Sequence, residues 1–171
     1  MARRTHVPKP RTSPPDLLLL QALLLDGRAS HRELASRTGL GLATVNRHVR
    51  AMEQAGTIRG YTVRVAPEAV GWTLTAIVGL RIDKGHVRTV QQEIAADPRI
   101  FAVYDVTGEW DGIVLARLRD REDLDDLVKT TLSATHIQRT STMFVLKTVL
   151  EEAVVNLPGS PARKGPSAHP L

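Results

Sequence analysis

The residues of this chain best suited to chemistry are small and polar side chains between positions 43 and 50. They alternate with apolar positions at helical spacing, and they are Ala43, Thr44, Asn46, Arg47, His48 and Arg50. Arginine can bind guanine edges or grip phosphate, asparagine can pair with adenine, and a small side chain can touch a thymine methyl group. The neighbouring helix would hold the DNA backbone, and the residues placed to do so are Arg28, Ser30 and Arg32. The set predicts a surface that reads double-stranded DNA.

The stretch from Ala35 to Val45 has the spacing of two helices joined by a tight turn. Ala35 is small enough to let the helices approach, and Gly39, four residues later, can turn with positive φ. Val45, six residues after the glycine, fixes the second helix on the core. That arrangement is typical of a helix-turn-helix, whose second helix can enter the major groove of DNA.

Three helices are predicted between residues 16 and 60. We expect Asp16 to be the N-cap of the first helix, which ends at Gly27. Ser30 and Glu33 have the spacing of a capping box at the start of the second helix. The third helix ends before Gly56, and its apolar positions are Leu42 or its neighbour, Val45, Val49 and Met52.

The first helix is apolar on nearly every side. Leu19, Leu20 and Leu23 are its expected core stripe, but further leucines occupy the other faces. A helix of this kind is seldom left in water, so another surface should cover it. We expect the N-terminal arm or a partner subunit to cover Leu17 and Leu24.

From residue 57 onward the apolar pattern changes to the period of a strand. Strands are predicted at 57–67, 74–82, 100–107, 112–119 and 137–150, with helices around residues 87–94 and 124–132. After the first strand, the remaining order is β-α-β-β-α-β, with residues 108–112 as the hairpin connection. Such an order is typical of a ferredoxin-like sandwich with helices on one side of an antiparallel sheet. Its other side would expose alternating apolar residues, so pairing with a second copy is expected.

The predicted fold class is α+β, an N-terminal helix-turn-helix domain joined by a strand or hinge to a ferredoxin-like βαββαβ domain. The expected parts are a flexible basic arm at 1–15, the helix-turn-helix domain at 16–60, a linker strand or hinge at 61–72, the ferredoxin-like effector-binding and oligomerisation domain at 73–152, and a disordered tail at 153–171. Four prolines in the arm and the Pro, Gly and Ser of the tail argue against regular structure there.

The formal net charge of +5 is unevenly distributed along the 171 residues. Residues 1–15 carry +4 and residues 16–60 carry +2, whereas residues 61–155 carry −3. A polyanionic partner at the N-terminal end explains this distribution better than solubility does. The chain has no cysteine, which excludes disulfides and thiol nucleophiles. With no secretory signal and no apolar run near ~20 residues, we expect a cytoplasmic protein that does not enter membranes.

No pattern in the sequence predicts catalysis, a metal site or a cofactor. None of the six histidines forms a His-x3-His pair, and no phosphate loop or nucleophile elbow occurs. The acidic run from Glu122 to Asp126 falls at a helix start, where the helix dipole favours it. We therefore expect a binding protein without catalytic residues, metal ligands or cofactors.

The chain resembles the Lrp/AsnC (feast/famine) family of transcriptional regulators. The resemblance rests on the helix-turn-helix followed by GTIRGYTVRVAPEAVG, VTGEWDGIVLARLRDREDLDDLV and RTSTMFVLKTV, and it covers roughly residues 16–152. Its most specific element is the Gly-x-aromatic-Asp turn at Gly108, Trp110 and Asp111, between strands of a βαββαβ unit. The resemblance implies a homodimer that assembles into tetramers or octamers, binds a palindromic DNA operator and responds to a small effector, commonly an amino acid.

For the effector, the resemblance points to the loop and to the last strand, at Gly108, Trp110, Asp111, Thr140 and Thr142. Asp111 could accept from an ammonium group, Thr140 and Thr142 offer hydroxyls to a carboxylate, and Gly108 permits close backbone approach. The same residues also suit ordinary roles, because Asp often caps a Gly-bounded turn and Thr is common in strands.

Three positions depart from the family pattern, and two other functions remain open. Gly41 stands where the family has a Ser or Thr N-cap, His48 replaces a common Arg, and Met52 replaces a Leu. One alternative is an enzyme like the siroheme decarboxylases, which share the architecture; only His86 or His136 could serve there. The other alternative is an amino-acid sensor without DNA binding, against which Asn46, Arg47 and Arg50 argue.

Overall fold

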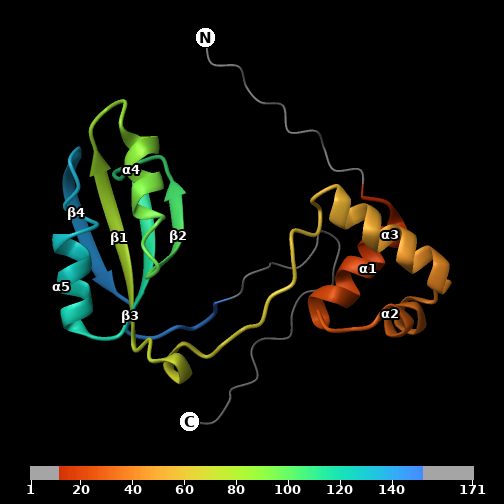
Figure 1. Cartoon of the computed structure of the whole chain (residues 1–171). Coiled ribbons are helices and arrows are strands. Elements are labelled where there is room, and N and C mark those ends of the chain that lie inside the picture. Colours follow the sequence, from red (N-terminus) through yellow and green to blue (C-terminus); the bar gives the residue numbers. More distant parts are fainter. Residues whose placement is uncertain (1–11, 152–171) are drawn as a thin grey trace. The chain divides into compact units, whose positions relative to one another are not determined.

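A computed structural model describes residues 12–151, which form two compact units (Figure 1). The first unit holds the three N-terminal helices, and the second runs from Arg64 to Val149. Residues 1–11 of the predicted arm and the whole predicted tail lie outside the described residues. Within residues 12–151, no helix is long and apolar enough to cross a membrane.

The first unit consists of α1 (Pro14–Leu25), α2 (His31–Thr38) and α3 (Leu42–Gln54). The expected capping box of α2 is confirmed, since the Ser30 hydroxyl accepts from the Glu33 N–H and the Glu33 carboxylate accepts from the Ser30 N–H. Gly39 ends α2 in the left-handed region with φ 73°. Leu19 and Leu34 join Val45, Val49 and Met52 in the core, as the helical spacing predicted.

The start of α1 differs from the prediction. Ser13, not Asp16, is the N-cap, and Pro14 and Pro15 occupy the first turn, where a proline loses no helical hydrogen bond. Asp16 completes a capping box from the third position. The exposed leucines of this helix are Leu18, Leu24 and Leu25, whereas Leu17 is half-buried.

The predicted strand at 57–67 is not a strand in this structure. Residues 59–66 have no ladder partner in the described chain, and the Tyr61, Val63 and Val65 side chains are exposed. The predicted linker strand at 61–72 becomes a 3-10 turn at Pro67–Val70 that Gly71 ends. Alternation is a local signal, but a strand also needs a neighbour to pair its backbone groups.

The second unit is the expected βαββαβ sandwich. Its elements are β1 (Leu74–Ile82), α4 (Val87–Ile94), β2 (Ile100–Asp105), β3 (Gly112–Leu118), α5 (Arg121–Lys129) and β4 (Ile137–Phe144). The sheet is antiparallel in the order β2-β3-β1-β4, and α4 and α5 cover one face of it (Figure 1). The last strand ends at Phe144, so the predicted strand to residue 150 was too long.

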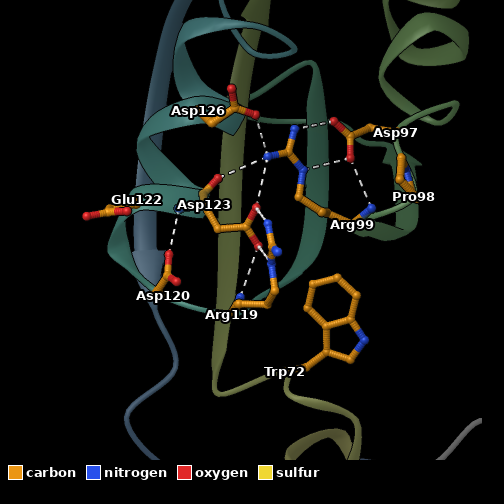
Figure 2. Close-up of a pocket in the computed structure, with 9 residues that line it drawn as sticks. All are labelled: Trp72, Asp97, Pro98, Arg99, Arg119, Asp120, Glu122, Asp123 and Asp126. Atoms are coloured by element: carbon orange, nitrogen blue, oxygen red, sulfur yellow. Dashed lines mark hydrogen bonds and ion pairs between the residues drawn. The ribbon is translucent and has the colours of Figure 1, made fainter.

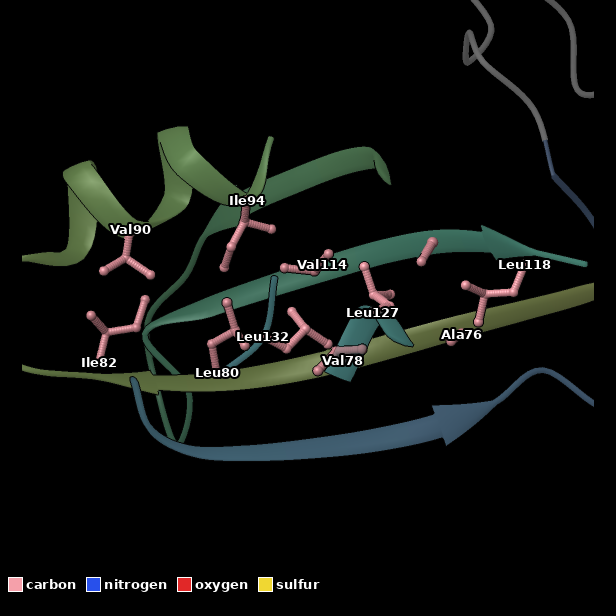
Figure 3. Packing of buried hydrophobic residues seen from close by; sticks show 11 residues of the cluster. Ala76, Val78, Leu80, Ile82, Val90, Ile94, Val114, Leu118, Leu127 and Leu132 are labelled. Atoms are coloured by element: carbon pink, nitrogen blue, oxygen red, sulfur yellow. The ribbon is translucent and has the colours of Figure 1, made fainter. Parts of the chain in front are cut away.

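Alternate residues of the two central strands point toward the helices and form the core (Figure 3). On β1, within the predicted strand at 74–82, these are Ala76, Val78, Leu80 and Ile82, and on β3 they are Val114, Ala116 and Leu118. The opposite face, which we call the open face, exposes Phe101, Tyr104 and Met143, each 45–55% accessible. An apolar sheet face of this kind is expected to bind another surface.

Candidate nucleic-acid interface and effector site

The outward side of α3 carries polar and small residues around a shallow hollow of about 570 Å³. The hollow is lined by Ala43, Asn46, Arg47, Arg50, Ala51 and Gln54. Val45, Val49 and Met52 are buried on the other side, so packing decides which side of α3 faces outward. The structure thus brings four of the predicted DNA-reading residues together at one surface. A fifth, Thr44, is half-buried beside them.

His48 does not belong to that surface, and the prediction that it faces outward was wrong. Its Nδ1 lies 2.7 Å from Oδ1 of Asp16, and the two side chains are 22% and 16% exposed. Position 48 follows Val45 by three residues and precedes Met52 by four, which places it beside the buried stripe. His48 therefore fastens α3 to α1.

Asp16 is the centre of this attachment. Its other carboxylate oxygen accepts from the Ser13 N–H at 2.9 Å and from the Ser13 hydroxyl at 2.6 Å. Burial by itself would raise the pKa of the Asp16 carboxyl, but the hydrogen bonds from Ser13 and His48 outweigh it and lower the pKa. One carboxylate thus caps α1 and holds α3.

The first turn of α2 lies next to the same surface. His31 Nδ1 is hydrogen-bonded to Oδ1 of Asn46, so the two helices of the motif are joined by a polar contact. Ser30 uses its hydroxyl as the N-cap of α2. Arg28 and Arg32 are exposed on either side of that cap, as expected for residues that grip a phosphate backbone.

The loop between β2 and β3 contains the predicted Gly108, Trp110 and Asp111 close together. Gly108 has φ 118°, a backbone conformation that favours glycine. Asp111 is hydrogen-bonded to the neighbouring strand β1. Its Oδ2 accepts the Ile82 N–H at 2.9 Å, and its own N–H donates to the Leu80 carbonyl. β1 pairs with β3 only as far as Leu80, which lies opposite Gly112, and this leaves the Ile82 N–H to Asp111.

Trp110 lies flat on the sheet between a glycine and an arginine. A Cβ added at Gly79 would come within 2.6 Å of the indole, so only glycine leaves room for the ring there. The Arg139 guanidinium lies 4.6 Å from the ring centroid and 2.8 Å from a carboxylate oxygen of Glu109. Arg81 donates to the Glu109 carbonyl oxygen and lies 3.6 Å from Asp111.

Thr140 and Thr142 lie on the other face of the sheet. They pair directly with Leu80 and Val78, whose side chains face the helices, whereas Trp110 covers Gly79 between them. A single subunit therefore does not assemble the predicted effector set. Arg81, Arg139 and Gly79 were missed; the sequence signal for Gly79 was a glycine inside an otherwise apolar strand.

A second hollow, of about 640 Å³, lies beside an ion-pair network at the start of β2 (Figure 2). Arg99 contacts Asp97 at 2.7 Å, Asp123 at 3.2 Å and Asp126 at 2.7 Å. The Arg119 side chain, then its backbone N–H and Arg99, overcome burial and lower the pKa of Asp123 to about 2. Asp123 and Asp126 of the acidic run thus bind Arg99 at the start of β2, while Asp120 is the N-cap of α5. Glu122 and Asp123 lie in the first turn of the helix, in agreement with the helix-dipole interpretation.

The histidines considered for an enzyme pack against each other. The rings of His86 and His136 are stacked with centroids 3.5 Å apart, and His136 Nδ1 lies 3.3 Å from Asp83. Among residues 12–151, no group of three or more His, Asp or Glu side chains is arranged to hold a metal ion.

Comparisons with known proteins match both units. Residues 13–59 match the family described as winged helix-turn-helix DNA-binding, and residues 75–155 match the Lrp/AsnC ligand binding domain. An HTH-type transcriptional regulator of Pyrococcus horikoshii is 39% identical over 137 residues, which are 80% of this chain and 93% of that protein. The chain belongs to the Lrp/AsnC family.

Solved structures of Lrp/AsnC-type regulators have the same fold. The transcriptional regulator of Neisseria meningitidis in complex with L-methionine aligns with a TM-score of 0.78 at 28% identity, over 85% of this chain and 96% of that one. The feast or famine regulatory protein of M. tuberculosis complexed with L-methionine aligns with a TM-score of 0.77 at 30% identity, over 84% and 97%. This Lrp/AsnC protein is accordingly a DNA-binding transcriptional regulator with an effector-binding domain, as the sequence predicted.

Proposed function

We propose that this regulator binds imperfect palindromic operators as a homodimer, with one α3 helix in each of two successive major-groove segments. The observation that carries the proposal is the exposed hollow on α3, which Asn46, Arg47 and Arg50 line together. Ala43 and Thr44 provide small contacts at the start of the helix. Arg28, Ser30 and Arg32 hold the DNA backbone from the adjoining helix. We place the protein in the cytoplasm, with its DNA.

The open face of the sheet supports the proposed dimer. Phe101 and Tyr104 on β2 and Met143 on β4 are exposed apolar residues of that face, and a second copy of the same face would remove them from water. Tetramers or octamers would then arise from further contacts between dimers.

The proposed effector is an amino acid bound at the Gly108–Asp111 loop. The L-methionine in two related structures supports this ligand class. Asp111 already accepts a backbone N–H, so we assign it to hold the loop rather than to meet the ammonium group. Arg81 and Arg139 beside Trp110 offer guanidinium groups to the carboxylate. Thr140 and Thr142 join this site only if another subunit brings their face to the loop.

We propose no catalytic activity. His86 and His136 stack on each other and His136 Nδ1 lies 3.3 Å from Asp83, so we assign these histidines a structural role. Addition of an iron tetrapyrrole should produce no shift of its Soret band.

Double substitution of Arg47 and Arg50 by alanine tests the recognition surface. A promoter fragment from the protein's own gene, titrated at low salt, should lose at least about a hundredfold in affinity, because two cationic contacts are removed. A matched control replaces Arg88 and Arg121, exposed arginines of α4 and α5, and removes the same charge without touching α3. Equal affinity losses in both variants, or retained affinity in the first, would reject the assignment.

A further inference from the structure

We infer that His31 is a specificity-determining residue, which positions the amide of Asn46 so that α3 presents hydrogen-bond donors to the DNA. The inference rests on the proposed recognition surface and concerns the base that this surface prefers. His31 is the first residue of α2, directly after the Ser30 cap, and its Nδ1 contacts Asn46 on α3.

The contact defines which end of the Asn46 amide is free. Its partners are Nδ1 of His31 and Oδ1 of Asn46. An amide oxygen carries no hydrogen, so the histidine nitrogen must donate, which it can do in the Nδ1-protonated neutral tautomer or in the charged ring. The carbonyl end of the amide is therefore directed at α2, and the NH2 group occupies the opposite end.

This orientation disfavours the usual pairing of asparagine and adenine, because His31 already uses one lone pair of the amide oxygen and fixes its direction. That pairing needs the amide oxygen to accept from adenine N6 while the amide nitrogen donates to N7. With its oxygen directed at His31, Asn46 presents N–H groups to the hollow on α3. Arg47 and Arg50, which line the same hollow, also carry only donors.

Three neighbouring donor side chains match a base edge that carries only acceptors. In the major groove, guanine presents N7 and O6, whereas adenine presents one acceptor and one amino donor. The surface should therefore select guanine at the position read by Asn46. Removing His31 releases the amide, and adenine should become acceptable there.

Selection from a random pool of double-stranded DNA tests this with four proteins: wild type, His31→Ala, Asn46→Ala and the double variant. The position read by Asn46 is the one whose preference Asn46→Ala abolishes. Wild type should select guanine there, and His31→Ala should raise the adenine-to-guanine ratio at least about fivefold. In the Asn46→Ala background, His31→Ala should change that ratio less than about twofold, because its effect acts through the amide.

His31→Gln, which keeps an N–H donor, should retain the guanine preference and serves as the conservative control. Thermal unfolding checks each fold, and His31→Phe replaces His31→Ala should the latter unfold, with the same expected result. Adenine selected by wild type, an unchanged ratio in His31→Ala, or an effect that persists without Asn46 would overturn the inference. A wild-type pool with no enriched sequence would instead refute the recognition surface itself.

Discussion

Replacing Gly79 by alanine should push Trp110 off the sheet, and this substitution tests how the loop between β2 and β3, the proposed effector site, is held. The added Cβ would lie 2.6 and 2.7 Å from two indole carbons and 3.0 Å from a third. Carbon atoms in favourable contact are about 3.5–4.0 Å apart, so the ring must move outward by about 1 Å. Arg139 lies on its other side and must move with it.

The size of the effect follows from two opposing contributions. Overpacking of this kind costs about 1–3 kcal/mol of the free energy of unfolding. Alanine in a strand is otherwise better than glycine by about 0.5–1 kcal/mol, because it loses less chain entropy on folding. In a Trp110→Ala background, where nothing obstructs the methyl group, Gly79→Ala should therefore be neutral or stabilising. The sign of the change thus depends on Trp110.

Urea unfolding followed by far-ultraviolet circular dichroism, at one subunit concentration, measures all four members of this cycle. In a Trp72→Phe background, Trp110 fluorescence should shift to the red when the ring leaves Gly79. Gly27→Ala is the matched control, because its nearest atom would be 3.7 Å away. The same destabilisation with and without Trp110, or an unchanged emission maximum, would refute the stacking explanation.

Two other substitutions test the remaining assignments. Asp123→Asn should cost about 2 kcal/mol at neutral pH, because the folded pKa of Asp123 is lowered to about 2 from 3.8; this contribution is complete above about pH 4 and disappears as the pH falls toward 2. Urea midpoints from pH 2 to 7 would show it, and equal acid sensitivity in the variant would contradict the role of the network. Tyr104→Lys, on the open face, should weaken the dimer at least about tenfold in sedimentation velocity, since an unpaired charge would enter an apolar interface. An unchanged dissociation constant would place the interface elsewhere.

Local sequence signals predicted the helix-turn-helix correctly. The pair Ser30 and Glu33 and the turn at Gly39 depend on neighbouring residues only, and capping and left-handed geometry are properties of short segments. The cap of α1 was misplaced because Asp16 and Ser13 both suit a helix start, and two prolines between them suggested an irregular arm. In the structure those prolines fill the first turn.

Contacts between distant segments were beyond local patterns. Position 48 carries a polar residue on the proposed recognition helix, and only the approach of Asp16, 32 residues earlier, turns it inward. The alternation at 57–67 predicted a strand, but no strand of the described chain pairs with this segment. The predicted effector residues do not lie together for a similar reason. The strand register places Thr140 and Thr142 on one face of the sheet and Trp110 on the other.

By itself, the sequence determined the family, the two units and the outward side of α3 with Asn46, Arg47 and Arg50, because hydrophobic periodicity and turn chemistry act over a few residues. Tertiary structure decided which polar groups are free to meet a ligand. His31 faces Asn46, Asp111 faces the Ile82 N–H, and Trp110 rests on Gly79 only after separate elements pack together. A side chain's partner is set by distance in space, which spacing along the chain does not encode for segments far apart.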